Sequence, residues 1–145
     1  MGFADTDRNR AAAHEAGHAL IAASRGVGVA AIEIYGTDGS GTTHLREEPS
    51  DLDRVWILYG GPAAEEIVFG QWTLTSRPAG LDDLLLAHSL CRQIGIADMR
   101  GIQKQVVEFL RKKQARLELI AVRLLAADTV HGIELDDLLQ EEPRR

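Results

Sequence analysis

The most informative segment of the chain is Ala11-Ala-Ala-His-Glu-Ala-Gly-His-Ala-Leu-Ile-Ala-Ala-Ser24. Half of its residues are alanine, the strongest helix former. Asp5-Thr-Asp7 offers an N-cap and early negative charge, so we expect a helix from there to about Ser24. Gly17 costs about 1 kcal/mol relative to alanine inside a helix, and the close approach of another backbone would account for it.

Two short strands are expected after this helix. Ala31–Tyr35 and Thr42–Arg46 have the residue types of strands, and Thr37-Asp-Gly-Ser-Gly41 between them is typical of a hairpin turn. A second helix opens at Ser50-Asp-Leu-Asp53. Gly60-Gly-Pro62 is expected to break it and to start a third helix that ends at Phe69.

The C-terminal half favours helices. Gln71–Gly80 shows no clear period and is expected to be a loop. Further helices are expected over Asp82–Ile94, Ile102–Ala127 and Glu134–Gln140. The prediction is therefore a mostly α (α+β) fold of about six helices and one small β-hairpin or sheet, with too few strands for a doubly wound fold.

Composition narrows the class of protein. A length of 145 residues fits one domain spanning residues 1–145. The net charge of −6 disfavours a nucleic-acid partner, which normally requires a basic face. The single cysteine, Cys91, excludes an internal disulfide and suits a reducing compartment. No apolar run approaches the ~20 residues of a membrane span. We therefore expect a cytoplasmic protein without a membrane segment.

The segment His14-Glu-Ala-Gly-His18 contains side chains that can bind a metal ion and transfer a proton. Residues four apart share one helical face, so both imidazoles can reach one zinc ion. Glu15 lies about 100° around the helix and can instead reach a water in the open zinc position, from which it takes a proton as general base. This H-E-x-x-H logic is that of metallopeptidases. The alternative is a pair of solvated histidines on an alanine-rich helix.

Zinc catalysis usually needs a third protein ligand. Spacing alone leaves two acidic pairs about equal: Glu65-Glu66, on the helix that follows, and Asp82-Asp83, for which helix capping is the alternative explanation. The other histidines of the chain are His44, His88 and His131.

Three motifs resemble the peptidase domain of the FtsH-type ATP-dependent zinc proteases, in the order of that family. They are His14-Glu-Ala-Gly-His-Ala-Leu20, Gly60-Gly-Pro-Ala-Ala-Glu-Glu-Ile-Val-Phe-Gly70 and Asp82-Asp-Leu-x-x-Ala-x-x-Leu90. A weaker match is Thr129-Val-x-Gly-x-Glu-Leu135. Together the motifs cover nearly the whole chain.

The resemblance implies a helical, zincin-like zinc peptidase domain. The family's third ligand is the Asp of N-D-L, which falls on Asp83, while Asp82 stands where the family has Asn. The expected metal ligands are thus His14, His18 and Asp83, with Zn²⁺ as cofactor and Glu15 as the catalytic base. Glu65 and Glu66 become supporting or packing residues.

The resemblance also concerns the substrate. Gly41-Thr-Thr-His-Leu45 is similar to the edge strand beside the family's active site, and a free strand edge can pair with an extended substrate backbone. His44 is then a groove or surface residue. The expected activity is endopeptidase cleavage of extended peptides or unfolded proteins.

Expectations about partner proteins rest only on the resemblance to the FtsH-type family. Its members join this domain to an ATPase and a membrane anchor, and neither is expected here. Gly36–Thr43 lacks the lysine of a P-loop, and no apolar run has the length of a membrane span. A separate ATPase partner and a homo-oligomer, a hexamer by resemblance, are therefore expectations. Two alternatives to an enzyme are a non-catalytic zinc-binding regulator or partner of a full-length ATP-dependent protease, and a helical interaction module with a decayed metal site.

Overall fold

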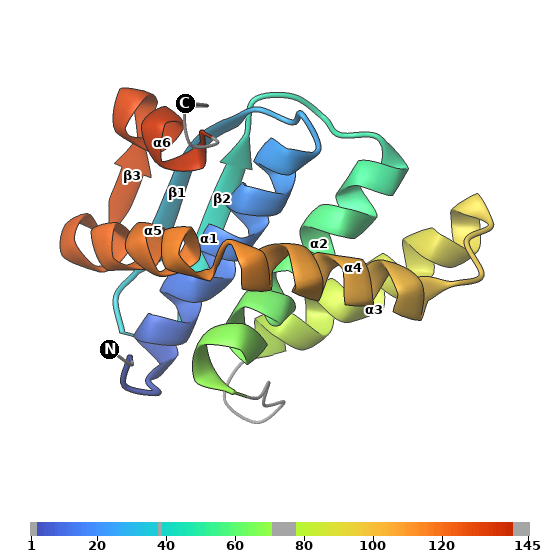
Figure 1. Cartoon of the computed structure of the whole chain (residues 1–145), viewed down its shortest axis with the longest axis horizontal. Coiled ribbons are helices and arrows are strands. Elements are labelled where there is room, and N and C mark those ends of the chain that lie inside the picture. Colours follow the sequence, from blue (N-terminus) through green and yellow to red (C-terminus); the bar gives the residue numbers. More distant parts are fainter. Residues whose placement is uncertain (1–2, 38, 71–77, 141–145) are drawn as a thin grey trace.

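A computed structural model describes residues 3–37, 39–70 and 78–140. These residues form six helices and one three-stranded sheet (Figure 1), which confirms the mostly α (α+β) fold. In chain order the elements are α1 (Asp7–Ser24), β1 (Val29–Tyr35), β2 (Ser40–Leu45), α2 (Asp51–Phe69), α3 (Pro78–Ile94), α4 (Met99–Lys112), α5 (Gln114–Ala127), β3 (Thr129–His131) and α6 (Gly132–Leu139).

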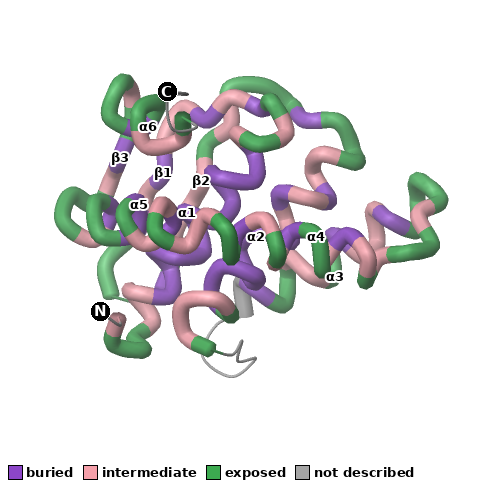
Figure 2. Tube along the Cα trace, in the orientation of Figure 1, coloured by how far each residue is buried: buried purple, intermediate pink, exposed green. Residues whose placement is uncertain are grey.

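Helix α1 is the centre of the molecule. It begins after Thr6, whose side-chain oxygen accepts the Asn9 N–H, and it ends at Ser24 as expected. Every residue from Arg10 to Ala22 is buried, as the purple stretch of α1 in Figure 2 shows. Its principal neighbours are α2, α5, β1 and β2. Alanine on nearly every side lets all of these elements pack closely around one helix.

The closest of these contacts joins α1 to α2. A Cβ atom built on Gly17 would lie 2.3 Å from the carbonyl oxygen of Gly60 and 2.5 Å from Cβ of Ala64. A Cβ atom on Gly60 would in turn lie 2.8 Å from the carbonyl oxygen of Gly17. The two backbones therefore touch where each helix carries a glycine, and the expected close approach at Gly17 is present.

The predicted break at Gly60-Gly-Pro62 is wrong. Helix α2 continues through all three residues as one element, with Pro62 inside it. A proline in a helix interior costs about 3 kcal/mol in isolation, which is why the local sequence indicates a break. In the folded protein, Gly60 and Gly61 are buried against α1. A continuous α2 keeps that contact, so tertiary packing overrides local preference.

The predicted long helix over Ile102–Ala127 is divided. The chain leaves helical geometry at Lys113 (φ −105°, ψ 17°), which separates α4 from α5. The reason is that the two halves have different partners, since α4 packs mainly on α2 and α5 mainly on α1 (Figure 1). A continuous apolar stripe cannot reveal such a change of partner. None of the helices within the described ranges has the length and apolar content to cross a membrane.

Helix α3 begins earlier than predicted. It starts at Pro78, a residue suited to the first helical position, rather than at Asp82. Residues 71–77 of the expected loop lie outside the described residues. The early start places Asp82 and Asp83 in the second turn of α3, so the helix-capping explanation for this pair is wrong.

The sheet has the strand order β2-β1-β3 with both pairs antiparallel. The hairpin of β1 and β2 was predicted, whereas β3 was not. Asp128 ends α5 in a left-handed conformation (φ 66°), and the next three residues pair with β1. One face of the sheet packs on α1, and β2 lies at an edge beside it.

We predict that Gly17→Ala destabilises the protein. In an ordinary helix interior the change would stabilise by about 1 kcal/mol. Here the added methyl group meets the backbone of Gly60, and overpacking of this kind costs about 1–3 kcal/mol. Urea unfolding would measure the difference. Gly28→Ala is the control, because the atoms nearest to its Cβ belong to the side chain of Arg46, which can move. A more stable Gly17→Ala variant would contradict the packing argument.

Candidate metal centre

Helix α1 presents His14 and His18 on one face. The two rings lie 4.5 Å apart between centroids and are nearly perpendicular, at 89°. His14 is 2% exposed and His18 is 8% exposed. Their Nε2 atoms are 3.0 Å apart. The alternative interpretation, a pair of solvated histidines, is therefore wrong, because both imidazoles are buried and their Nε2 atoms converge.

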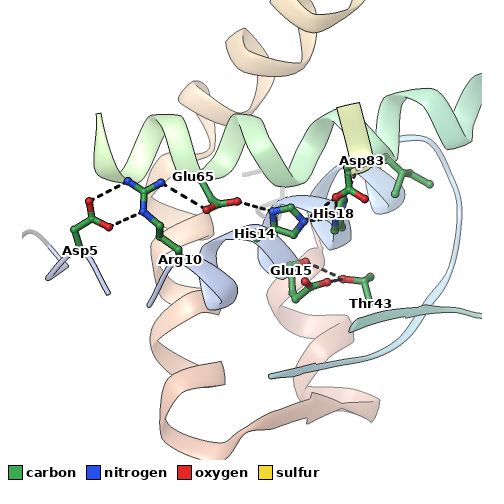
Figure 3. Close-up of polar contacts among 9 residues, drawn as sticks. Asp5, Arg10, His14, Glu15, His18, Thr43, Glu65 and Asp83 are labelled. Atoms are coloured by element: carbon green, nitrogen blue, oxygen red, sulfur yellow. Dashed lines mark hydrogen bonds and ion pairs between the residues drawn. The ribbon is translucent and has the colours of Figure 1, made fainter. Parts of the chain in front are cut away.

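Asp83 of α3 completes a triangle with the two imidazoles. Its Oδ2 atom lies 2.8 Å from Nε2 of His14 and 3.0 Å from Nε2 of His18 (Figure 3). These three residues form the one group of metal-ligand type found among the described residues. Two ligands of a tetrahedral zinc ion stand about 3.3 Å apart when the bonds are 2.0–2.1 Å. The triangle is slightly smaller than that, so the donor set fits a metal ion after a small expansion.

Both imidazoles are oriented by hydrogen bonds at Nδ1, the ring nitrogen that faces away from the triangle. The Nδ1–H group of His14 donates to Oε2 of Glu65 over 2.7 Å, and that of His18 donates to the carbonyl oxygen of Ile57 over 2.6 Å. An Nδ1–H donor leaves the Nε2 lone pair for a metal. These two hydrogen bonds thus select the tautomer in which both Nε2 atoms can act as ligands.

Gly61 also shapes the centre, in a role that the sequence analysis missed. A Cβ atom on Gly61 would lie 2.5 Å from Cε1 of His14 and 2.7 Å from Cε1 of His18. Any side chain there would push both rings out of place. Gly60-Gly-Pro62 contains the signal, but local sequence alone associates this tripeptide with a helix break.

Hydrogen bonding sets the protonation of the metal-free centre. Burial lowers the pKa of His14, but hydrogen bonds to Asp83 and Glu65 and the nearby Glu15 charge outweigh burial and raise it to about 9. Burial raises the pKa of Asp83, and its hydrogen bonds to His14 and His18 reverse this and hold the pKa well below its usual range. In the absence of metal, a protonated His14 beside an ionised Asp83 is therefore favoured, and a bound cation would take the place of that proton.

Glu15 lies beside the triangle without belonging to it. The hydroxyl of Thr43 donates to Oε1 of Glu15 over 3.0 Å (Figure 3). A Cβ atom on Gly41 would come within 2.8 Å of Cγ of Glu15, so β2 packs directly on this side chain. Glu15 is 5% exposed, and its side chain lies between its own helix α1 and strand β2. Glu15 therefore stands next to the three converging atoms and outside their triangle.

A cavity of about 270 Å³ opens onto the centre. It is bounded by α1, the edge strand β2, α2 and α3, and its lining combines the polar centre with apolar side chains. The lining residues are His14, Glu15, His18, Gly41, Thr42, Thr43, Leu45, Ile57, Leu58 and Asp83. A larger cavity of about 840 Å³ near the junction of α4 and α5 is lined by no histidine and no carboxylate among the described residues, so it offers no comparable chemistry.

The other candidate residues lie elsewhere. Glu65 is fully buried behind His14 and contacts its Nδ1 side. Glu66 and Asp82 are exposed and stand outside the triangle. His44 pairs with Glu33 on the outer face of the hairpin. His88 lies 3.4 Å from the side-chain amide of Gln103.

Comparison with known proteins agrees with this geometry. Residues 10–94, more than half of the chain, match the family described as Peptidase M50B-like. The chain belongs to this family. The match contains all three residues of the triangle and Glu15, which supports a metallopeptidase in general.

Two relatives are ATP-dependent zinc metalloproteases. FtsH 2 of Sphaerobacter thermophilus is 27% identical over 94% of this chain and 28% of its own length. FtsH 1 of Methylacidiphilum infernorum is 30% identical over 72% of this chain and 18% of its own length. The resemblance to FtsH-type peptidases is thus confirmed, although the matching family model is named for another peptidase group. The chain spans less than a third of the length of either relative.

We predict that the imidazoles are required for metal binding. Protein loaded with zinc and then desalted should retain about one ion per chain, measured by elemental analysis. His14→Ala and His18→Ala should each lose it, since two remaining ligands bind weakly. His44→Ala is the control, because that ring pairs with Glu33 instead. Full zinc retention in both α1 variants would rule out this centre.

A second prediction concerns the carboxylate. Asp83→Asn should weaken zinc binding by more than the about 10–100-fold that is typical when an outer partner of a ligand is changed. Asp82→Asn should leave the dissociation constant unchanged, because its side chain is exposed outside the triangle. Competition with a chromophoric chelator measures both. Loss of metal in Asp82→Asn with retention in Asp83→Asn would overturn the assignment.

Proposed function

We propose that the chain is a zinc-dependent metalloendopeptidase that hydrolyses peptide bonds of extended or unfolded polypeptides. His14, His18 and Asp83 would hold the ion, and Glu15 would act as general base. The observation that carries the proposal is the position of the Glu15 carboxylate, beside the three converging ligand atoms and inside the cavity that they line. A structural metal site has no use for such a group at its open side.

In the proposed reaction the metal ion and the protein side chains have separate roles. A zinc ion in this centre would polarise the substrate carbonyl and lower the pKa of a water molecule to about 7. The Glu15 carboxylate would take the proton of that water and later deliver it to the leaving amine. Thr43 orients Glu15 for this task by donating to Oε1. The hydrogen bonds to Glu65 and to the carbonyl of Ile57 keep the imidazoles facing the metal.

The edge strand supports an extended substrate. β2 pairs with β1 on one side, and no strand among the described residues pairs with its other side. An extended peptide can add to such an edge through main-chain hydrogen bonds. Thr42, Thr43 and Leu45 of β2 line the cavity, so an added peptide would pass directly over the centre. A segment inside a folded protein is held by its own contacts and cannot readily enter this cavity in an extended form, which favours unfolded substrates.

The proposal extends to partners. The two relatives are named as ATP-dependent, and Gly36–Thr43 of this chain lacks a P-loop lysine. None of the proposed chemistry at the centre uses a nucleotide. We therefore expect the 145 residues to cleave unfolded chains slowly without ATP. An ATPase from outside these residues, and a homo-oligomer that assembles with it, would be needed for folded substrates.

We predict that Glu15→Gln separates an enzyme from a zinc-binding protein. The variant should keep its zinc and its fold, because Glu15 is not a ligand. Turnover of an unfolded casein-type substrate should fall by roughly 10²–10⁴-fold, the usual contribution of general-base catalysis. Glu66→Gln is the matched control on α2, since its side chain is exposed outside the triangle.

Two results would contradict the proposal. If zinc-loaded parent protein cleaves nothing in a broad peptide library, a non-catalytic zinc-binding partner of an ATP-dependent protease becomes the better explanation. If Glu15→Gln cleaves as fast as the parent, the activity comes from a contaminating protease. Sensitivity of the parent activity to a chelator, restored by added zinc, completes the test.

A further inference from the structure

Arg10 is a buried charge close to the metal centre. It lies on α1 one turn before His14 and is 1% exposed. Its Nε and Nη2 atoms lie 2.5 and 2.9 Å from the two carboxylate oxygens of Asp5. Its Nη1 atom lies 3.6 Å from Oε1 of Glu65 (Figure 3). The guanidinium group therefore joins a carboxylate at the surface to a carboxylate that contacts a metal-ligand imidazole.

The guanidinium is held firmly in one orientation. The two-point contact with Asp5 has the fork geometry of a strong arginine–carboxylate pair. The ring of Phe69 lies under the guanidinium, 4.8 Å from its central carbon to the ring centroid. Burying an arginine is costly unless its contacts are well formed. A simple salt link at the helix start would not require burial beside Glu65.

We propose that Arg10, oriented by Asp5, is a positioning residue for the metal centre and acts through Glu65 on His14. One oxygen of the Glu65 carboxylate, Oε2, accepts the His14 Nδ1–H, while the other, Oε1, faces Arg10. A hydrogen bond on Oε2 and a 3.6 Å ion pair on Oε1 together favour one rotation of the carboxylate. That rotation sets the plane of the imidazole, and so the direction of its Nε2 lone pair.

The proposal rests on the proposed zinc site but not on peptide hydrolysis. Zinc affinity is therefore the readout. Glu65→Gln should weaken zinc binding by about 10–100-fold, the range for outer partners of metal ligands. Arg10→Gln should weaken it by about tenfold, and Arg10→Lys should recover only part of the loss, because lysine lacks the planar fork.

Asp5→Asn provides a second test in case the variants of the buried residues Arg10 and Glu65 fail to fold. The Asp5 side chain is 57% exposed, so its replacement leaves the core intact while releasing Arg10. Its matched control is Asp128→Asn, which removes the ion pair of Arg8 on the same turn of α1. Asp5→Asn should lower the thermal stability more than Asp128→Asn, because it weakens the pairing of a buried guanidinium, so zinc affinity is compared at a temperature at which both metal-free variants are folded. Zinc affinity should fall in Asp5→Asn alone.

A double-mutant cycle tests the route through Glu65. In the Glu65→Gln background, Asp5→Asn and Arg10→Gln should have no further effect on zinc affinity, because the proposed path through Glu65 is already changed. Effects that simply add in the double variants would overturn the proposal, as would unchanged zinc affinity in both Asp5→Asn and Arg10→Lys.

The outcomes also separate this proposal from the proposed function. If the protein binds zinc tightly but cleaves no peptide, the proposed peptidase function is wrong. The positioning role of Arg10 can still be tested by zinc affinity. Peptide cleavage with zinc affinity that is insensitive to Arg10 and Asp5 would keep the enzyme and overturn the positioning role. A parent protein that binds no zinc would overturn both.

Discussion

Backbone contact between α1 and α2 is the constraint on which the rest of the structure depends. Gly17 and Gly60 allow the two helices to approach without intervening side chains. That distance brings Gly61 against the edges of both imidazoles and lets Glu65 reach His14. A wider separation by one methyl group would move the helix that backs the metal centre. The alanine content of α1 and the glycine pair of α2 therefore serve one purpose, a short and rigid spacing behind the ligands.

The same close packing concentrates charge where water is excluded. The described residues that are both buried and polar or charged are Arg10, His14, Glu15, His18 and Glu65, four of them on α1. Groups of this kind are tolerated inside a protein when they are paired or when they bind metal. Glu65 lies between Arg10 and His14, and Asp83 faces both imidazoles. Electrostatic pairing thus offsets the cost of burying the charged groups of α1, and a divalent ion would add to it.

Local features of this fold were predictable from sequence, and features set by contact between distant segments were not. The alanine-rich helix, the hairpin and the facing of His14 and His18 depend on neighbouring residues and were expected correctly. The continuity of α2 through Pro62 depends on α1, and β3 depends on β1, so neither is visible locally. Spacing left the acidic partner open between two pairs. A family motif favoured Asp83, and the fold brings Asp83 within 3.0 Å of both imidazoles. Arg10 was missed because its contact with Glu65 forms only when α2 packs against α1.

The origin of the three converging side chains has a mechanical consequence. His14 and His18 belong to one rigid helix, whereas Asp83 arrives on α3, 65 residues after His18. An ion shared among them would act as a cross-link that closes a long loop, and such links restrict the unfolded chain more as the loop lengthens. Helix α3 also carries several exposed leucines, at 81, 85 and 86, and so has less apolar burial to hold it than α1. Occupancy of the centre would thus govern how tightly α3 is fastened to the remainder of the molecule.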